Sequence, residues 1–367
     1  MAGGPGVAGV AGVAGGVGAD GWPAAAGAIA ERVLAALEGD VVVEGQRLPL
    51  RASIGVSPLD GPPGTLPEAA APLRQADAAL RLAKRRGASR VEVFDEALRS
   101  DSLARLAEEG ALARAVAAGE LTVHYQPVVD LGTGRAVGAE ALVRWPREGL
   151  GLVPPDRFIP LAEESGIIVD LGRFVLRRAC SDAAGWDDRV PGLAGGTVSV
   201  NVSPRQLTHP RFLADVDRAL ADSQLPPGRL TVEITESALV EDSGAVRDVL
   251  AAVRARGVGL ALDDFGTGYS SLGYVQTLPV DVLKVDKSFV DAITGPGRGT
   301  ALTEVVLKLA EATGLRTVAE GVETAAQAEA LRALGCRSGQ GYVWSRPVPA
   351  EGLPAAVAAL PDGPRGG

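Results

Sequence analysis

Short apolar runs alternate with helix-like segments over the last two thirds of the chain. Runs rich in β-branched and aliphatic residues predict eight strands, at 121–129, 135–144, 197–203, 229–235, 258–264, 280–286, 316–321 and 339–344. Most of the later runs are separated by amphipathic segments such as SGAVRDVLAAVRARG and ALTEVVLKLAEATG. Strands joined by crossover helices form a parallel sheet, and eight of them close most naturally as a TIM-like (β/α)8 barrel of the α/β class.

The first two predicted strands need a different connection. Only LGTG, residues 131–134, separates them, whereas a parallel crossover needs about a dozen residues or more. We therefore predict that the first strand runs antiparallel to its neighbours.

A smaller α/β piece precedes the barrel. Residues 24–38 have helical spacing, and VVVEGQRLPLRASIGVS alternates like a hairpin with Gly45 near its turn. After a Pro- and Gly-rich loop from Ser57 to Pro67, LPEAAAPLRQADAALRLAKRRG predicts a helix and SRVEVFD a strand. A further helix has Ser100 to Ser102 as capping candidates and Gly119 as its stop. The predicted parts are a disordered low-complexity tail (1–18), the small domain (19–97), a linker helix (98–119), the barrel domain (120–360) and a second disordered tail (361–367).

Composition limits the chemistry. The formal charge of −9 argues against a broad face for DNA or RNA duplexes, but it allows a small phosphate-bearing ligand where cations invert the local field. Cys180 and Cys336 are the only cysteines, which excludes a disulfide framework and suits a reducing compartment. With only His124 and His209, a histidine-rich metal cage is excluded. No apolar stretch is predicted to span a membrane, and the N-terminus lacks the basic start of a signal peptide. Catalysis would then rest on carboxylates, lysine and hard cations.

Polar residues follow the predicted strands where each one ends. In a barrel these ends open onto one face, so the side chains converge. Carboxylate and amide oxygens are the ligands that Mg²⁺ and Mn²⁺ prefer. The candidate ligands are Glu140, Asn201, Glu233, Asp263 and Asp264. Adjacent aspartates reach one pocket only if the strand ends or bends there, and FGTG is expected to supply that irregularity. A carboxylate that bridges two cations is typical of phosphodiester cleavage.

Each of these residues alone also has a structural interpretation. Asn201 could cap the SPRQL turn, KVD could form a surface ion pair, and AEGVE could begin a helix. With GQGYVW and its Gln340, seven such coincidences occur at successive strand ends, and together they favour one site.

The ordered motifs resemble those of the EAL domain, the cyclic di-GMP phosphodiesterase module of bacteria. They run from about Leu121 to Pro349: YQPVVDL, Glu140-Ala141-Leu142 with Arg144, FIPLAEESG, NVSPRQL, VEITES, LDDFGTGYSSL, LKVDKSFV, VAEGVET and QGY. Arg337 departs from the acid that often stands after the Gly-Cys pair, which puts substrate fit in question but not the metals.

The resemblance implies a role for each matching residue. Glu140, Asn201, Glu233, Asp263 and Asp264 would bind metal. Lys284 and Asp286 would orient or polarise the attacking water and the phosphate, and Glu320 would be the general base or a ligand of a second metal. Arg144, Gln340 and Gln126 would contact substrate. Glu236 would hold the DFGTGYSSL loop, and Glu323 would support the site.

The implied reaction is hydrolysis of cyclic di-GMP to linear pGpG with a pair of Mg²⁺ or Mn²⁺ ions, and Ca²⁺ is expected to inhibit. The resemblance also implies a bacterial cytoplasmic protein and a homodimer formed through the EAL domain. Whether a longer parent protein is membrane-associated is left open.

The small domain resembles the second half of a GGDEF diguanylate cyclase domain. SIGVS at 53–57 and ADAALRLAKRRG at 76–87 carry the resemblance, while the GGDEF signature is absent and Arg81 replaces a usual tyrosine. Synthesis of cyclic di-GMP is therefore not expected of this chain.

Two other functions stay open. A catalytically silent receptor would bind cyclic di-GMP without cleaving it, although no acid of the metal set is missing. Alternatively, the barrel alone would allow Lys284 to act as the Schiff-base lysine of an aldolase.

Overall fold

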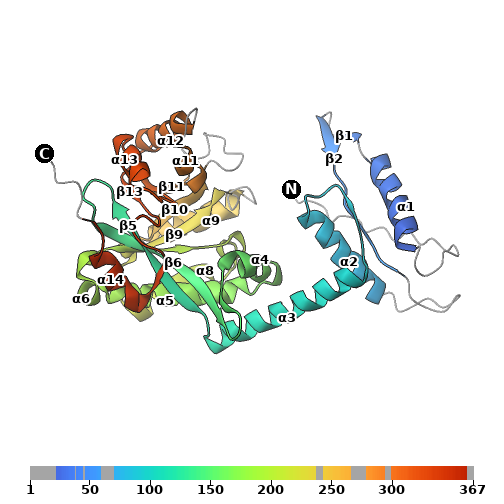
Figure 1. Cartoon of the computed structure of the whole chain (residues 1–367), viewed down its shortest axis with the longest axis horizontal. Coiled ribbons are helices and arrows are strands. Elements are labelled where there is room, and N and C mark those ends of the chain that lie inside the picture. The colour runs from blue at the N-terminus through green and yellow to red at the C-terminus, as the bar shows by residue number, and fades with distance from the viewer. Residues whose placement is uncertain are drawn as a thin grey trace. The chain divides into compact units, whose positions relative to one another are not determined.

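The computed structural model describes residues 22–37, 39–43, 46–58, 70–236, 243–265, 278–293 and 299–361. The chain divides into two compact units, Met1–Gly110 and Ala111–Gly367 (Figure 1). The division falls inside helix α3 (Glu96–Ala118), which lies where a linker helix is predicted. The two predicted tails lie almost entirely outside the described residues.

The second unit is a closed barrel of eight strands. They are β5 (Thr122–Asp130), β6 (Ala136–Arg147), β8 (Thr197–Asn201), β9 (Leu230–Thr235), β10 (Gly259–Phe265), β11 (Val282–Val285), β12 (Arg316–Ala319) and β13 (Ser338–Gly339). Neighbours pair in this order, and β5 closes the circle by pairing with both β6 and β13. The predicted TIM-like barrel is thus confirmed.

The first barrel strand is antiparallel to both of its neighbours, as predicted. The connection to β6 is a tight turn in which Gly134 N donates to Asp130 O at 2.8 Å. Asp130 Oδ1 also accepts hydrogen bonds from the backbone amides of Gly132 and Thr133. A turn this short cannot carry the chain back for a parallel pairing.

Helices surround the barrel, and two short strands extend it. The helices are α4 (Pro155–Ser165), α5 (Ile168–Ala184), α6 (Trp186–Arg189), α7 (Pro204–Leu207), α8 (Phe212–Ser223), α9 (Ser243–Ala255), α11 (Lys287–Ala292), α12 (Gly299–Ala312), α13 (Ala325–Ala333) and α14 (Leu353–Ala358). Strand β7 (Gly151–Val153) pairs with β6, and β14 (Val348–Pro349) pairs with β5. Apolar side chains of strands and helices form one continuous core, in which Leu176, Leu262 and Leu283 are almost completely buried.

The first unit is small. It contains α1 (Trp22–Leu37), β1 (Gly39–Val43), β2 (Gln46–Leu50), β3 (Ile54–Val56), α2 (Ala70–Arg85) and β4 (Val91–Val93). The predicted hairpin is formed by β1 and β2, while the SIGVS segment forms a separate strand, β3, parallel to β4. Most of the predicted loop 57–67 lies outside the described residues.

The predicted capping position of α3 is wrong. The helix begins at Glu96, so Ser100 and Ser102 lie inside it. Asp95 Oδ1 accepts a hydrogen bond from Leu98 N at 2.8 Å, which satisfies an amide of the first turn.

Candidate active site

A buried lysine stands at the centre of the predicted site. Lys284 lies on β11 and is only 2% exposed. Its Nζ lies 2.6 Å from Glu233 Oε2, 3.3 Å from Asp263 Oδ1 and 3.7 Å from Glu140 Oε2. It also pairs with Glu320 Oε1. The structure therefore joins acids from β6, β9, β10 and the end of β12 around one ammonium group.

Amide side chains hold Glu140 in a fixed orientation. Asn201 Nδ2 donates to Glu140 Oε1 at 2.5 Å, and Gln340 Nε2 donates to Glu140 Oε2 at 2.6 Å. Gln340 also donates to Gln126 Oε1, and Gln126 in turn donates to the carbonyl of Ser345. These bonds link β5, β6, β8 and the residue that follows β13, and Glu140 accepts both of the bonds that these amides donate to it.

The adjacent aspartates reach one pocket because β10 is irregular there. The pairing of β10 with β11 shifts register between Leu262 and Phe265. Asp264 has φ +54, in the left-handed region that Asp tolerates better than most residues, and its amide donates to Asp263 Oδ1 at 2.9 Å. The predicted irregularity is present at Asp264, while residues 266–268 of the FGTG segment lie outside the described residues.

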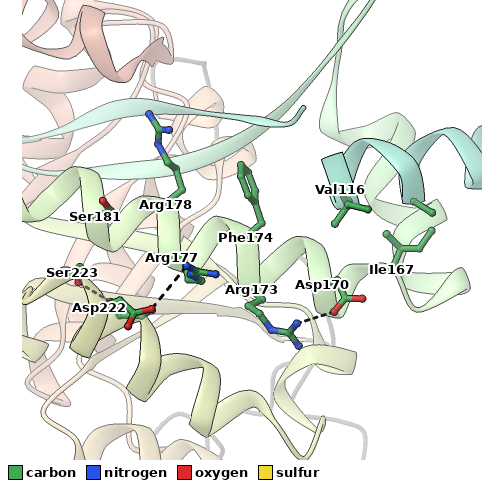
Figure 2. A pocket seen from close by; sticks show the side chains of 13 residues that line it. Val116, Ile167, Asp170, Arg173, Phe174, Arg177, Arg178, Ser181, Asp222 and Ser223 are labelled. Atoms are coloured by element: carbon green, nitrogen blue, oxygen red, sulfur yellow. Dashed lines mark hydrogen bonds and ion pairs between the residues drawn. The ribbon is translucent and has the colours of Figure 1, made fainter. Parts of the chain in front are cut away.

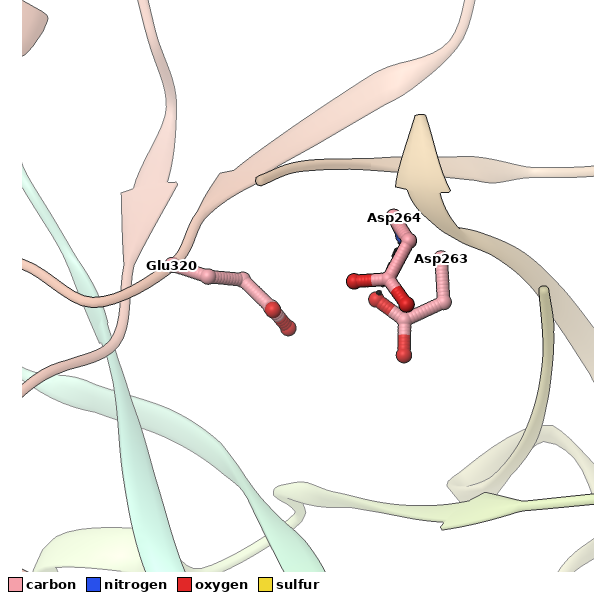
Figure 3. A group of neighbouring side chains, drawn as sticks. All are labelled: Asp263, Asp264 and Glu320. Atoms are coloured by element: carbon pink, nitrogen blue, oxygen red, sulfur yellow. Dashed lines mark hydrogen bonds between the residues drawn. The ribbon is translucent and has the colours of Figure 1, made fainter. Parts of the chain in front are cut away.

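The two aspartates and Glu320 form one open group (Figure 3). One carboxylate oxygen from each of Asp263, Asp264 and Glu320 lies within 4.8 Å of the others. Gly321 follows with φ +63, and a Cβ there would lie 2.5 Å from Lys287 Cγ, so the turn that directs Glu320 inward requires glycine.

The pKa values show that burial disfavours the ionised form of several acids here. Burial raises the pKa of Glu320 to about 8 and that of Glu233 well above its usual range, in spite of the Lys284 charge. Burial and the neighbouring Asp263 also raise the pKa of Asp264. In Glu140, burial is outweighed by the Lys284 charge and by hydrogen bonds from Gln340 and Asn201, so its pKa is lowered. Burial acts to lower the pKa of Lys284, but the surrounding carboxylates raise it well above its usual value.

This donor set fits Mg²⁺ or Mn²⁺. One small cation could bind three carboxylate oxygens at once, one each from Asp263, Asp264 and Glu320. Burial is the main cause of the raised pKa values of Asp264 and Glu320, and hard cations would favour the ionised forms of both acids.

Other predicted site residues lie around this group. Asp286 caps α11, since its Oδ1 accepts hydrogen bonds from Ser288 N and Oγ, and its charge also acts on Asp264. Arg144 is half-buried on β6, and its Nη1 donates to Val143 O at 2.8 Å. Asn201 does not cap the following turn, because Ser203 does.

The two supporting glutamates differ in setting. Glu323 is exposed and pairs with Lys287 Nζ at 2.9 Å, a contact that sequence reasoning missed. Glu236 Oε2 is buried and has no hydrogen-bond partner among the described residues. Most of the loop assigned to Glu236 lies outside the described residues, from position 266 to 277.

The fold and site together define an α/β-barrel protein with a carboxylate and lysine centre at the carboxyl ends of its strands. Residues 109–347 match the EAL domain model, and the chain belongs to this family.

Curated relatives match both units. A Caulobacter vibrioides protein described as an uncharacterized signaling protein is 42% identical over 338 residues, 90% of this chain and 40% of the relative. The bifunctional diguanylate cyclase/cyclic di-GMP phosphodiesterase MucR of Pseudomonas aeruginosa is 37% identical over 336 residues, 92% of this chain and 48% of MucR. The chain thus spans less than half the length of these two relatives.

Solved structures support the same family. The MucR phosphodiesterase in complex with c-di-GMP superposes with a TM-score of 0.62 at 41% identity, over 65% of this chain and 96% of that one. The EAL enzyme Bd1971, bound to cAMP and cyclic di-GMP, gives a TM-score of 0.67 at 31% identity over 70% of each chain. None of the described helices combines the length and the apolar character needed to cross a bilayer.

Proposed function

We propose that the chain is a metal-dependent phosphodiesterase that hydrolyses cyclic di-GMP to linear pGpG. The observation that carries the proposal is the complete acidic centre, with Asp263, Asp264 and Glu320 grouped within 4.8 Å beside the Lys284 ammonium. The cyclic di-GMP complexes of two EAL relatives support the choice of ligand.

Each side chain has a task in this reaction. Bound Mg²⁺ or Mn²⁺, held by Glu140, Asn201, Glu233, Asp263 and Asp264, would polarise the phosphate and acidify a water molecule. Glu320 would take the proton of the attacking water once bound cations lower its raised pKa enough to keep it ionised near neutral pH. Lys284 stabilises charge that develops on the phosphate, and Asp286 helps to orient the water.

Substrate contacts come from the rim of the site. Arg144 offers a guanidinium fork to a phosphate oxygen. Gln340 and Gln126 hold Glu140 in place, and the buried Gln340 Oε1, which lacks a hydrogen-bond partner among the described residues, remains available to a donor of the ligand.

Turnover of cyclic di-GMP with Mg²⁺ or Mn²⁺, followed by mass spectrometry of the product, tests the proposal. We expect pGpG with either ion and none in EDTA. A matched variant, Glu320→Gln, should bind cyclic di-GMP and release no pGpG. Tight binding by the unmodified chain without turnover in either metal would instead establish the silent receptor.

The aldolase alternative is disfavoured by the environment of Lys284. A Schiff-base lysine needs a lowered pKa, and the surrounding carboxylates raise this one. Absence of borohydride trapping with a keto substrate is the expected result.

We also propose a homodimer formed through the EAL domain. Leu302 and Val305 on α12 are each 54% exposed and lie three residues apart, on one face of the helix. Leu302→Lys with Val305→Lys should weaken self-association in sedimentation velocity, and unchanged self-association would exclude this face. The location of the protein in the bacterial cytoplasm and the GGDEF-like nature of the first unit remain predictions.

A further inference from the structure

Helix α3 carries apolar side chains that nothing in the described chain covers. Leu103 and Leu106 are each 62% exposed, which is high for leucine. On the opposite side of the same helix, Leu112 and Ala115 are 0% and 1% exposed and belong to the core of the second unit. The helix therefore has one buried side and one exposed apolar side.

The exposed side follows a coiled-coil spacing. Its members, which we call the α3 seam, alternate at intervals of three and four residues: Leu103, Leu106, Gly110, Ala113 and Ala117. This is the a and d pattern of a heptad repeat, which faces a second helix of the same kind. The seam is about 21 Å long at 1.5 Å per residue.

Charged residues beside the α3 seam indicate which kind of helix could pack against it. In this heptad frame Glu109 occupies a g position and Arg114 the e position five residues later, the two positions that meet between parallel, in-register helices. Arg114 is exposed and has no ion pair with another described residue. Glu109 is half-buried and lies 3.6 Å from Arg105 on its own helix.

A groove borders the carboxyl-terminal part of the seam (Figure 2). Ala113 and Ala117 line it together with Val116 of α3 and with Ile167 and Phe174, and its volume is about 750 Å³. Small residues at a seam allow a second helix to approach closely. A helix that follows the seam would cover the apolar edge of this groove.

We infer that α3 pairs with α3 of a second copy of this chain, parallel and in register. Leu103 and Leu106 then pack against their counterparts, and Glu109 of each copy meets Arg114 of the other. A second copy is favoured because it supplies both the matching apolar spacing and the opposite charge at the required offset. This contact is separate from the α12 face and does not depend on catalytic activity.

Single cysteines test the pairing directly, because the two native cysteines are buried. Leu106→Cys and Ala113→Cys stand at d positions, and Ala104→Cys and Asp101→Cys stand on the opposite side of the helix as controls. Under mild oxidation we expect disulfide-linked dimers from both seam variants, at least tenfold above the controls. Linkage of only one seam variant, as in an antiparallel pair, or of none above the controls, overturns the inference.

A charge exchange provides an independent measurement. Arg114→Glu should weaken α3 cross-linking of the Leu106→Cys variant several-fold, and adding Glu109→Arg should restore it. Circular dichroism of each variant checks that the fold is retained, since all of the substituted side chains lie at least partly at the surface. Equal cross-linking in all three variants would show that these charges do not meet.

Discussion

Replacing Lys284 by methionine would test whether this residue holds the acidic centre together. Methionine keeps most of the length and apolar stem of lysine but removes the ammonium from contact with Glu233, Asp263 and Glu320. Two unit charges 3 Å apart attract by about 5 kcal/mol at an effective dielectric constant of 20, and desolvation offsets much of that gain. Loss of one partner from a buried charge cluster typically costs about 3–5 kcal/mol, and we expect a loss of that size.

The assay is urea unfolding in EDTA, compared with unfolding in Mn²⁺. In EDTA the variant leaves several buried acids without a cation, so the full loss should appear; bound Mn²⁺ should recover much of it. Lys308→Met is the matched control and should change stability little, because Lys308 forms a surface ion pair with Glu304 and no other ion pair with a described residue. A loss below about 1 kcal/mol for Lys284→Met in EDTA would refute the claim that the acids depend on this ammonium.

The free energy of unfolding should also depend on pH. The folded protein holds protons on Glu320 up to about pH 8, whereas an unfolded glutamate releases them near pH 4.5. Since the folded state binds more protons across this interval, the free energy of unfolding should fall as the pH rises through it, by on the order of a few kcal/mol without metal. The decline should be steeper in Lys284→Met and weaker in Mn²⁺. A metal-free stability that rises from pH 5.5 to pH 8 would contradict this sign.

Three further outcomes are expected. Glu320→Ala should lower turnover of cyclic di-GMP at least about 100-fold while calorimetry still detects binding; near-normal turnover would refute its role as base. Ca²⁺ should occupy the centre and inhibit, because its longer bonds misplace the water, so full activity in Ca²⁺ alone would count against the proposed site. Tyr125→Phe should reduce the free energy of unfolding by about 1–3 kcal/mol without changing turnover. The reason is that the buried Tyr125 hydroxyl donates to Asp182 Oδ2 at 2.7 Å, on the outside of the barrel. Unchanged urea unfolding would show that this bond is not stabilising.

The barrel could be predicted because each of its strands is specified by a short segment of the sequence. Each strand is a short apolar run, and the LGTG turn alone is too short for a parallel connection. The start of α3 was misplaced for an equally local reason. Ser100 and Ser102 are good caps, but Asp95 is one too, and the helix begins at the earlier residue.

The central position of Lys284 could not be predicted in the same way. In the sequence it is one polar residue near the end of VDVLKVD, which is equally compatible with a surface ion pair. Its burial depends on Glu233, Asp263 and Glu320, which come from three other segments of the chain. Similarly, the pair of Asp263 and Asp264 indicated an irregular strand, but the left-handed backbone of Asp264 depends on the register between β10 and β11.

Charge balance explains why one lysine among so many acids is compatible with a metal site. Five carboxylates lie in the centre, those of Glu140, Glu233, Asp263, Asp264 and Glu320, and Lys284 offsets one of their charges when all are ionised. The remaining four negative charges equal in number the positive charges of two divalent ions, whereas one ion would leave the centre negative. Lys284 thus holds the acids of different strands together before metal binds, while burial, with a smaller contribution from the neighbouring acids, raises the pKa of Glu320 to about 8. Under the proposed function, bound ions would favour the ionised form of Glu320, and this carboxylate could then accept a proton from water at neutral pH.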